Sequence, residues 1–220
     1  MNTPKISVYF MPGMAASPLI FEHIRLPEDR FEMHFLEWVP AHKNETLKEY
    51  AGRMCEKIDR PAPVLVGVSF GGILVQEMAA YIRPAKVIII SSVKCKKELP
   101  AKMLFARYTG MHKLLPTGLV NNVELLAKYA FGEAVVKRLE LYKRYLTVPD
   151  REYMDWAINA VVRWDQEEAI PGIVHIHGEK DPVFPIARIK NCIRIKQGTH
   201  IMIINRYKWF NEHLPSLIES

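Results

Sequence analysis

Residues 64–72 read Val-Leu-Val-Gly-Val-Ser-Phe-Gly-Gly, and this stretch decides the fold of the chain. Its first half is a near-continuous apolar run, as expected of a strand buried on both faces, and a helical pattern follows it. Between them lies a Gly-x-Ser-x-Gly motif centred on Ser69. At a sharp strand-to-helix turn, side chains two positions before and after the serine would collide with the backbone, and both positions here are glycine, Gly67 and Gly71. The motif therefore predicts an elbow that presents the Ser69 hydroxyl.

A glycine-rich turn between a strand and a helix can also bind phosphate. The stretch lacks the Gly-x-Gly-x-x-Gly spacing of dinucleotide sites and the Gly-Lys-Ser/Thr ending of nucleotide-binding loops. We therefore interpret Ser69 as a candidate nucleophile.

Outside this turn, short β-branched runs alternate with amphipathic segments, a pattern typical of an α/β protein with a mostly parallel sheet flanked by helices. Six strands are expected, at residues 5–10, 31–38, 63–68, 87–91, 173–176 and 192–195. Helices are expected at residues 17–25, 46–58, 72–82, 122–129, 134–145, 152–164 and 201–213. Proline cannot continue a helix without losing a hydrogen bond, so Pro215 is expected to stop the last one.

The alternation breaks after the fourth strand. Residues 93–169 show helical periodicity without a convincing strand, and this segment is too long for a plain connection. We therefore expect one core, formed by residues 1–92 and 170–220, with residues 93–169 inserted as a helical cap.

Two polar residues follow later strands at positions where parallel sheets place their sites. A serine hydroxyl is a poor nucleophile and needs a base held by a third group. His200 follows the last predicted strand and Asp181 the fifth, so both lie just past strand carboxyl ends. Asp155 and Asp165 are alternative acids, but the His-Gly-x-x-Asp-Pro context favours Asp181. The chain order Ser, Asp, His fits a nucleophile, its orienting acid and its base.

With these three motifs, the chain resembles the α/β-hydrolase superfamily over essentially its whole length. The resemblance implies a catalytic triad of Ser69, His200 and Asp181. It also implies an oxyanion hole made by two backbone N–H groups, those of Phe70 and Met14.

Two features depart from the family pattern. In the loop that carries Met14, the family usually has a histidine directly before the glycine, and this chain has Pro12 before Gly13. The first predicted strand corresponds to the family's third, so we expect no N-terminal antiparallel hairpin. A serine nucleophile also sets the chain apart from the dehalogenase and epoxide-hydrolase branches, which use aspartate.

The resemblance implies a hydrolase that cleaves a small or medium carboxylic ester or thioester through an acyl-enzyme on Ser69, without a cofactor. The same triad serves C–C bond hydrolases and aminopeptidases, so these remain alternatives, as does a ligand-binding receptor with little turnover. We expect a small-molecule substrate; the sequence does not indicate the oligomeric state.

Composition excludes several other classes. The chain has 220 residues, 49% of them hydrophobic and 25% charged, which fits one globular domain. The formal net charge of +6 comes from basic residues spread along the chain, so we expect no nucleic-acid partner. Three cysteines without a Cys-x-x-Cys spacing predict neither a disulfide framework nor a zinc site and fit a reducing compartment.

The sequence also indicates neither a membrane-spanning segment nor a metal-binding motif. Pro12 and Gly13 interrupt the apolar N-terminal stretch, and no run approaches the roughly 20 residues of a membrane-spanning helix, so we expect a cytoplasmic protein. His175 and His177 alternate on one strand, but no motif offers a third ligand, and we predict no metal site.

Overall fold

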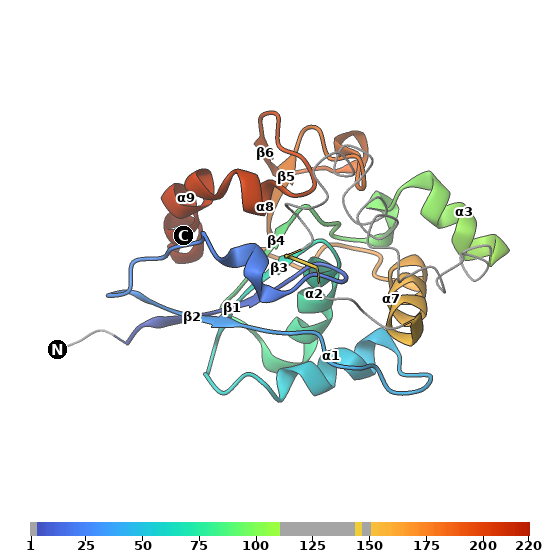
Figure 1. The fold of residues 1–220 in the computed structure, drawn as a ribbon, viewed down its shortest axis with the longest axis horizontal. Coiled ribbons are helices and arrows are strands. Elements are labelled where there is room, and N and C mark those ends of the chain that lie inside the picture. The colour runs from blue at the N-terminus through green and yellow to red at the C-terminus, as the bar shows by residue number, and fades with distance from the viewer. Residues whose placement is uncertain (1–3, 111–143, 147–150) are drawn as a thin grey trace.

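The computed structural model describes residues 4–110, 144–146 and 151–220. Within these ranges six parallel strands form one sheet in the order β2-β1-β3-β4-β5-β6 (Figure 1). The strands are β1 Ile6–Met11, β2 Phe31–Phe35, β3 Val64–Val68, β4 Lys86–Ile90, β5 Val174–Gly178 and β6 Ile193–Ile195. The predicted α/β sheet is confirmed.

Helices connect the strands. The α-helices are α1 Leu47–Cys55, α2 Phe70–Ile82, α3 Ala101–Thr109, α7 Arg151–Arg163, α8 Met202–Asn205 and α9 Tyr207–Glu219. The described ranges also hold three short 3-10 helices, η1 Pro18–Phe21, η2 Lys96–Glu98 and η5 Ile186–Arg188. No helix of the described ranges is long and apolar enough to cross a membrane.

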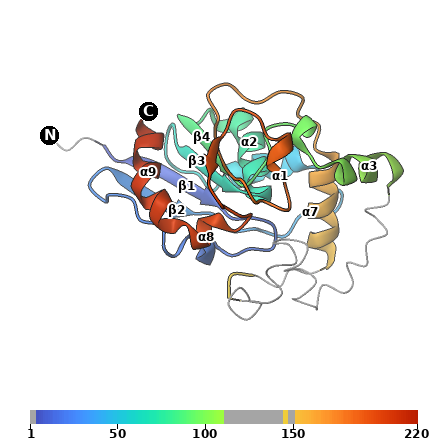
Figure 2. The ribbon, with the colours of Figure 1, turned by 90° about the horizontal axis from the view of Figure 1, so that it is seen from above.

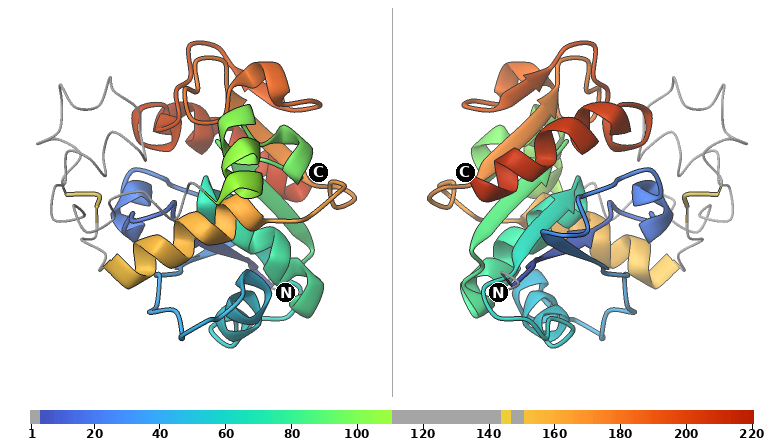
Figure 3. Two further views of the ribbon diagram at one scale, coloured as in Figure 1. Left: turned by 90° about the vertical axis from the view of Figure 1, so that its right-hand side faces the viewer. Right: turned by 90° about the vertical axis from the view of Figure 1, so that its left-hand side faces the viewer.

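Helices cover both faces of the sheet because its central strands are apolar on both faces. On one face, α1 and α2 pack against Tyr9, Leu65 and Ile89, which point the same way from β1, β3 and β4. On the other face, α9 and η1 cover the alternate residues, such as Phe10 and Val66 (Figures 1 and 2). The helices α3 and α7 pack on each other at one end of the molecule (Figure 3).

The strand order reverses between β1 and β3, which are neighbours although β2 lies between them in sequence. In open parallel sheets, such a reversal leaves a crevice at the carboxyl ends of the strands, where sites form. The loops after β1 and β3 meet there.

Several expected boundaries are wrong, and three of these errors concern the segments at 17–25, 31–38 and 201–213. The predicted helix at 17–25 is only the single turn η1, and the Ser17 side chain makes no capping hydrogen bond at its start. The strand predicted at 31–38 ends at Phe35, since its partner β1 ends at Met11, just before Pro12, which has no N–H for the ladder.

The third error concerns the last helix. The segment predicted as one helix at 201–213 is divided into α8 and α9, and α9 continues through Pro215 to Glu219. Burial of Pro215 and Ile218 against the core helps to offset the lost backbone hydrogen bond. Of the helices predicted in the insertion, the one at 122–129 and nearly all of that at 134–145 lie outside the described residues.

Candidate active site

Ser69 lies at the turn between β3 and α2 in a backbone conformation that L-residues rarely adopt, with φ 53° and ψ −119°. Its N–H donates to the carbonyl of Ile90 at 2.9 Å, which ties the turn to β4. A Cβ atom at Gly67 would overlap the carbonyl of Gly71, and one at Gly71 would overlap the carbonyl of Pro12. The glycines thus allow the close packing that holds Ser69 in a strained position, a feature common at functional sites.

The structure brings Ser69, His200 and Asp181 together. His200 Nε2 lies 2.9 Å from Ser69 Oγ, and His200 Nδ1 lies 2.9 Å from Asp181 Oδ2. An ionised carboxylate can only accept, so Nδ1–H donates to Asp181 and the neutral ring leaves Nε2 free to accept the serine proton. His200 and Asp181 are buried, whereas Ser69 is half-buried.

Asp181 is held rigidly. Its Oδ1 accepts the backbone N–H groups of Val183 at 2.8 Å and Phe184 at 3.0 Å. Burial alone would raise the pKa of Asp181, but the His200 ring and the Phe184 N–H outweigh it, so the pKa lies below its ordinary value. The carboxylate is therefore ionised at neutral pH.

Two buried histidines of β5 continue this network. His177 Nε2 lies 2.8 Å from the carbonyl of Phe184 and must donate to it, so Nδ1 accepts from His175 Nε2 at 3.1 Å. His177 Nε2 also lies 3.6 Å from Asp181 Oδ2. Burial lowers the pKa of His177, and burial together with His177 and Lys94 lowers the pKa of His175 to about 2. Both rings are neutral at neutral pH.

The loop after β1 passes beside the serine. A Cβ placed on Gly13 would lie 3.4 Å from Ser69 Cβ and 4.0 Å from Ser69 Oγ. The carbonyl of Gly13 accepts the N–H of Ala16 at 3.1 Å, which closes a turn over residues 13–16. Among the described residues, the backbone N–H groups of Met14 and Phe70 have no hydrogen-bond partner. As far as the described part of the chain goes, both groups are available to bind an oxygen atom.

Side chains from α7 pack near this loop. Tyr153 and Met154 are buried in one cluster with Ala15 and Phe70. The Tyr153 hydroxyl lies 3.5 Å from the Ala15 N–H. Thus α7, which belongs to the predicted insertion, packs against the neighbours of Ser69.

Trp38 is a site residue that the sequence reasoning missed. The sequence predicts it in the strand at 31–38, but it lies in the loop beyond β2, where its indole N–H donates to the Gly13 carbonyl at 2.8 Å. Its ring stacks on Phe70 with centroids 4.8 Å apart. The sequence signal was weak: a tryptophan shortly after an apolar run whose strand end was placed too late.

The alternative residues lie elsewhere. Asp155 pairs with Arg151 at 3.6 Å and Asp165 with Lys48 at 3.6 Å. Within the described ranges, no group of three or more histidine, cysteine, aspartate or glutamate side chains is arranged to hold a metal ion.

The fold is that of known hydrolases. An esterase from Thermogutta terrifontis matches with a TM-score of 0.70 and 14% identity, over 99% of this chain and 91% of the esterase. An enol-lactonase from Burkholderia xenovorans matches with a TM-score of 0.70 and 15% identity, over 99% and 93% of the two chains. An esterase from Exiguobacterium antarcticum matches with a TM-score of 0.66 and 16% identity, over 100% and 94%. No protein-family model and no curated protein sequence matches the chain. The chain has the α/β-hydrolase fold.

Proposed function

We propose that the protein is a serine hydrolase that cleaves a small or medium carboxylic ester or thioester through an acyl-enzyme on Ser69. The single observation that carries the proposal is the series of two 2.9 Å hydrogen bonds from Ser69 Oγ through His200 to Asp181. This arrangement gives a hydroxyl a base, and the base an orienting carboxylate, as nucleophilic catalysis needs.

In the first step, Ser69 Oγ attacks the substrate carbonyl carbon while its proton passes to His200 Nε2. The carbonyl electron pair moves to oxygen, and the resulting oxyanion accepts the N–H groups of Phe70 and Met14. As the oxyanion collapses, the alcohol or thiol leaves with the proton from His200. Water then attacks the acyl-enzyme by the same route and releases the acid, so no cofactor is required.

Asp181 acts through His200. Its ionised Oδ2 accepts from Nδ1 and stabilises the imidazolium that forms when the ring takes the serine proton. The two N–H groups on Oδ1 keep the carboxylate in this orientation.

The substrate class is supported by the structural neighbours, which include esterases and an enol-lactonase. We propose that residues 93–169 form a cap on the core, 1–92 and 170–220, and that this cap selects the acyl group. The packing of α7 against Ala15 and Phe70 supports this assignment.

The test combines turnover and covalent labelling. The wild-type protein should hydrolyse short-chain p-nitrophenyl esters or acyl thioesters, and a fluorophosphonate should modify Ser69, as read by peptide mass spectrometry. Ser69→Ala should abolish labelling and reduce kcat by roughly 10⁴-fold or more.

Ser91 offers a matched control. It follows β4 as Ser69 follows β3, and its φ of 49° is similar, but its buried hydroxyl has no hydrogen-bond partner among the described residues. Ser91→Ala should keep turnover and labelling. Loss of activity in Ser91→Ala alone, or labelling without any turnover, would contradict the proposal, and the second result would indicate a binding protein.

A further inference from the structure

The peptide group between Gly13 and Met14 carries two atoms with different tasks. Its carbonyl oxygen accepts two hydrogen bonds, from the Ala16 N–H at 3.1 Å and from the Trp38 indole N–H at 2.8 Å. Its nitrogen is the backbone N–H of Met14. A trans peptide is planar, with C=O and N–H pointing in opposite directions, and no described peptide bond is cis. Whatever fixes the Gly13 carbonyl therefore also fixes the direction of the Met14 N–H.

The same indole ring touches the residue that carries the second proposed donor. Trp38 stacks on Phe70, with ring centroids 4.8 Å apart and planes 8° from parallel. The Trp38 ring also makes an edge-to-face contact with Tyr153 of α7, with ring centroids 5.8 Å apart. One side chain thus contacts the turn that carries Met14 and the first residue of α2.

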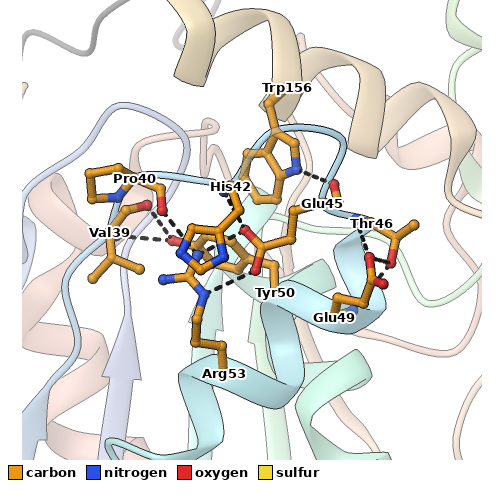
Figure 4. Close-up of polar contacts among 9 residues, drawn as sticks. All are labelled: Val39, Pro40, His42, Glu45, Thr46, Glu49, Tyr50, Arg53 and Trp156. Carbon is orange, nitrogen blue, oxygen red and sulfur yellow. Dashed lines mark hydrogen bonds and ion pairs between the residues drawn. The ribbon is translucent and has the colours of Figure 1, made fainter.

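Trp38 is itself held in place by the loop that follows it. The Tyr50 hydroxyl accepts the Val39 N–H at 3.0 Å and donates to the Val39 carbonyl at 2.9 Å (Figure 4). Arg53 donates to the carbonyl of Pro40 at 2.9 Å. The two residues after Trp38 are therefore anchored to α1, which limits how far the indole can move.

A second anchor joins this loop to α7. Glu45 accepts both Arg53 Nε at 2.9 Å and Arg53 Nη2 at 2.8 Å, and it also accepts the His42 N–H at 2.7 Å. The Glu45 carbonyl accepts the Trp156 indole N–H at 2.8 Å, as Figure 4 shows. The loop is thus fixed at both of its neighbouring helices before any substrate binds.

We propose that Trp38 is a positioning residue for the oxyanion hole, acting through the Gly13 carbonyl on the Met14 N–H. The indole N–H orients the peptide group and, by polarising its carbonyl, makes the Met14 N–H a stronger donor. This inference rests on the proposed function, since it deepens the role of the same site.

The first test removes the indole N–H. In Trp38→Phe the donor is lost, and replacing Trp38 by 3-benzothienylalanine exchanges the N–H for sulfur while keeping the bicyclic ring that stacks on Phe70. On a short-chain p-nitrophenyl ester, both proteins should show kcat reduced about 10- to 100-fold with KM unchanged within about twofold. This loss of kcat is smaller than the loss expected if an oxyanion-hole donor were deleted, because the Met14 N–H is still present and is only less well oriented.

The second test measures how well the site binds an oxyanion, by comparing the affinities of two ketones. A trifluoromethyl ketone forms a hemiketal in which Ser69 Oγ bonds to the carbonyl carbon, the proton passes to His200 and the oxygen becomes an anion. Its affinity should fall in both Trp38 proteins by the same factor as kcat/KM. The affinity of the planar methyl ketone of equal chain length should not change, because it places no anion in the hole.

Trp164→Phe is the matched control. The Trp164 indole N–H donates to Glu77 at 2.7 Å in a buried site, so this variant also loses one N–H bond. It should be destabilised at least as much as Trp38→Phe while keeping kcat. Equal losses of kcat in the control and in Trp38→Phe would overturn the inference, as would unchanged kcat in the benzothienyl protein. A wild-type protein without Ser69-dependent turnover or adduct would overturn the proposed function as well.

Discussion

The two turns that flank Ser69 are built in different ways. The elbow at residues 67–72 is encoded by its own glycines, which allow close contacts that a Cβ would block, within the elbow at Gly67 and with the end of β1 at Gly71. The turn at residues 13–16 is shaped from a distance, by the indole of Trp38 and the nearby hydroxyl of Tyr153. One turn is thus encoded where it lies, and the other depends on segments far along the chain.

Asp181→Asn sets the scale for this comparison, because it leaves both turns in place and alters only the chemistry. The amide would donate to His200 Nδ1 and favour the wrong tautomer, so kcat should fall about 10⁴-fold with little loss of stability. Steady-state kinetics and urea unfolding check both parts. Asp155→Asn, whose carboxylate pairs with Arg151, should keep full activity. The reverse pattern would mean that Asp155 is the acid.

Gly71→Ala should break the locally encoded turn. The new Cβ would overlap the backbone carbonyls of Pro12 and Met11, which cannot move aside as a flexible side chain could. We expect the free energy of unfolding to fall by about 3 kcal/mol or more, together with loss of fluorophosphonate labelling.

Gly13→Ala introduces the same change into the turn at residues 13–16. Its Cβ would make only an ordinary contact of 3.4 Å with Ser69 Cβ, so the cost in stability should stay below about 1 kcal/mol. Equal destabilisation by the two substitutions would remove the distinction between the turns.

Neither turn contains a titratable side chain, so the acid sensitivity of the fold should arise elsewhere. His175 and His177 have pKa values lowered by burial, which means that the native state binds fewer protons than the unfolded chain. Their contribution to stability is therefore present above about pH 6.5 and is lost as the pH falls below it. Each can contribute a slope of up to about 1.4 kcal/mol per pH unit.

Urea unfolding of the wild type and of His175→Phe between pH 7 and pH 5 checks this slope. The substitution should flatten the dependence, because one buried group no longer needs to be kept neutral. Identical slopes in the two proteins would show that the acid sensitivity originates in other groups.

A smaller effect on kcat should come from the loop that anchors Trp38, and through it the turn at residues 13–16. Tyr50→Phe removes the hydroxyl that binds both polar groups of Val39, so the free energy of unfolding should fall by about 1–2 kcal/mol. The value of kcat should drop less than in Trp38→Phe, because the indole N–H remains. Tyr81→Phe, which loses an exposed hydrogen bond to the Lys48 carbonyl, should change stability by less than about 0.5 kcal/mol. A Tyr50 variant with unchanged stability would contradict the anchoring described for this loop.

The same contrast explains which features could be predicted from the sequence. The elbow, with Gly67 and Gly71 around Ser69, is a local pattern, and the six strands are apolar runs that can be located one by one. The positions of His200 and Asp181 just after strands follow from the same reasoning. These features need no knowledge of distant contacts.

Trp38 could not be found in this way. Its role depends on a hydrogen bond to a carbonyl 25 positions earlier in the chain and on a strand that ends where its neighbour ends. The passage of α9 through Pro215 also depends on tertiary burial, which outweighs a local preference. Periodicity and local motifs carry no information about such contacts.

The parallel sheet also has a consequence for how the molecule folds. The pairing of β4 with β5 joins Ile88 to Val174, and the bond between Ser69 and His200 spans 131 positions. Contacts between residues so far apart form slowly, because a long loop must close before any contact is gained. During synthesis, a ribosome-bound chain whose β6 and His200 have not yet emerged lacks the histidine that we propose as the base of Ser69. Such a chain should be inert toward esters, and activity should arise together with the docking of the last strand.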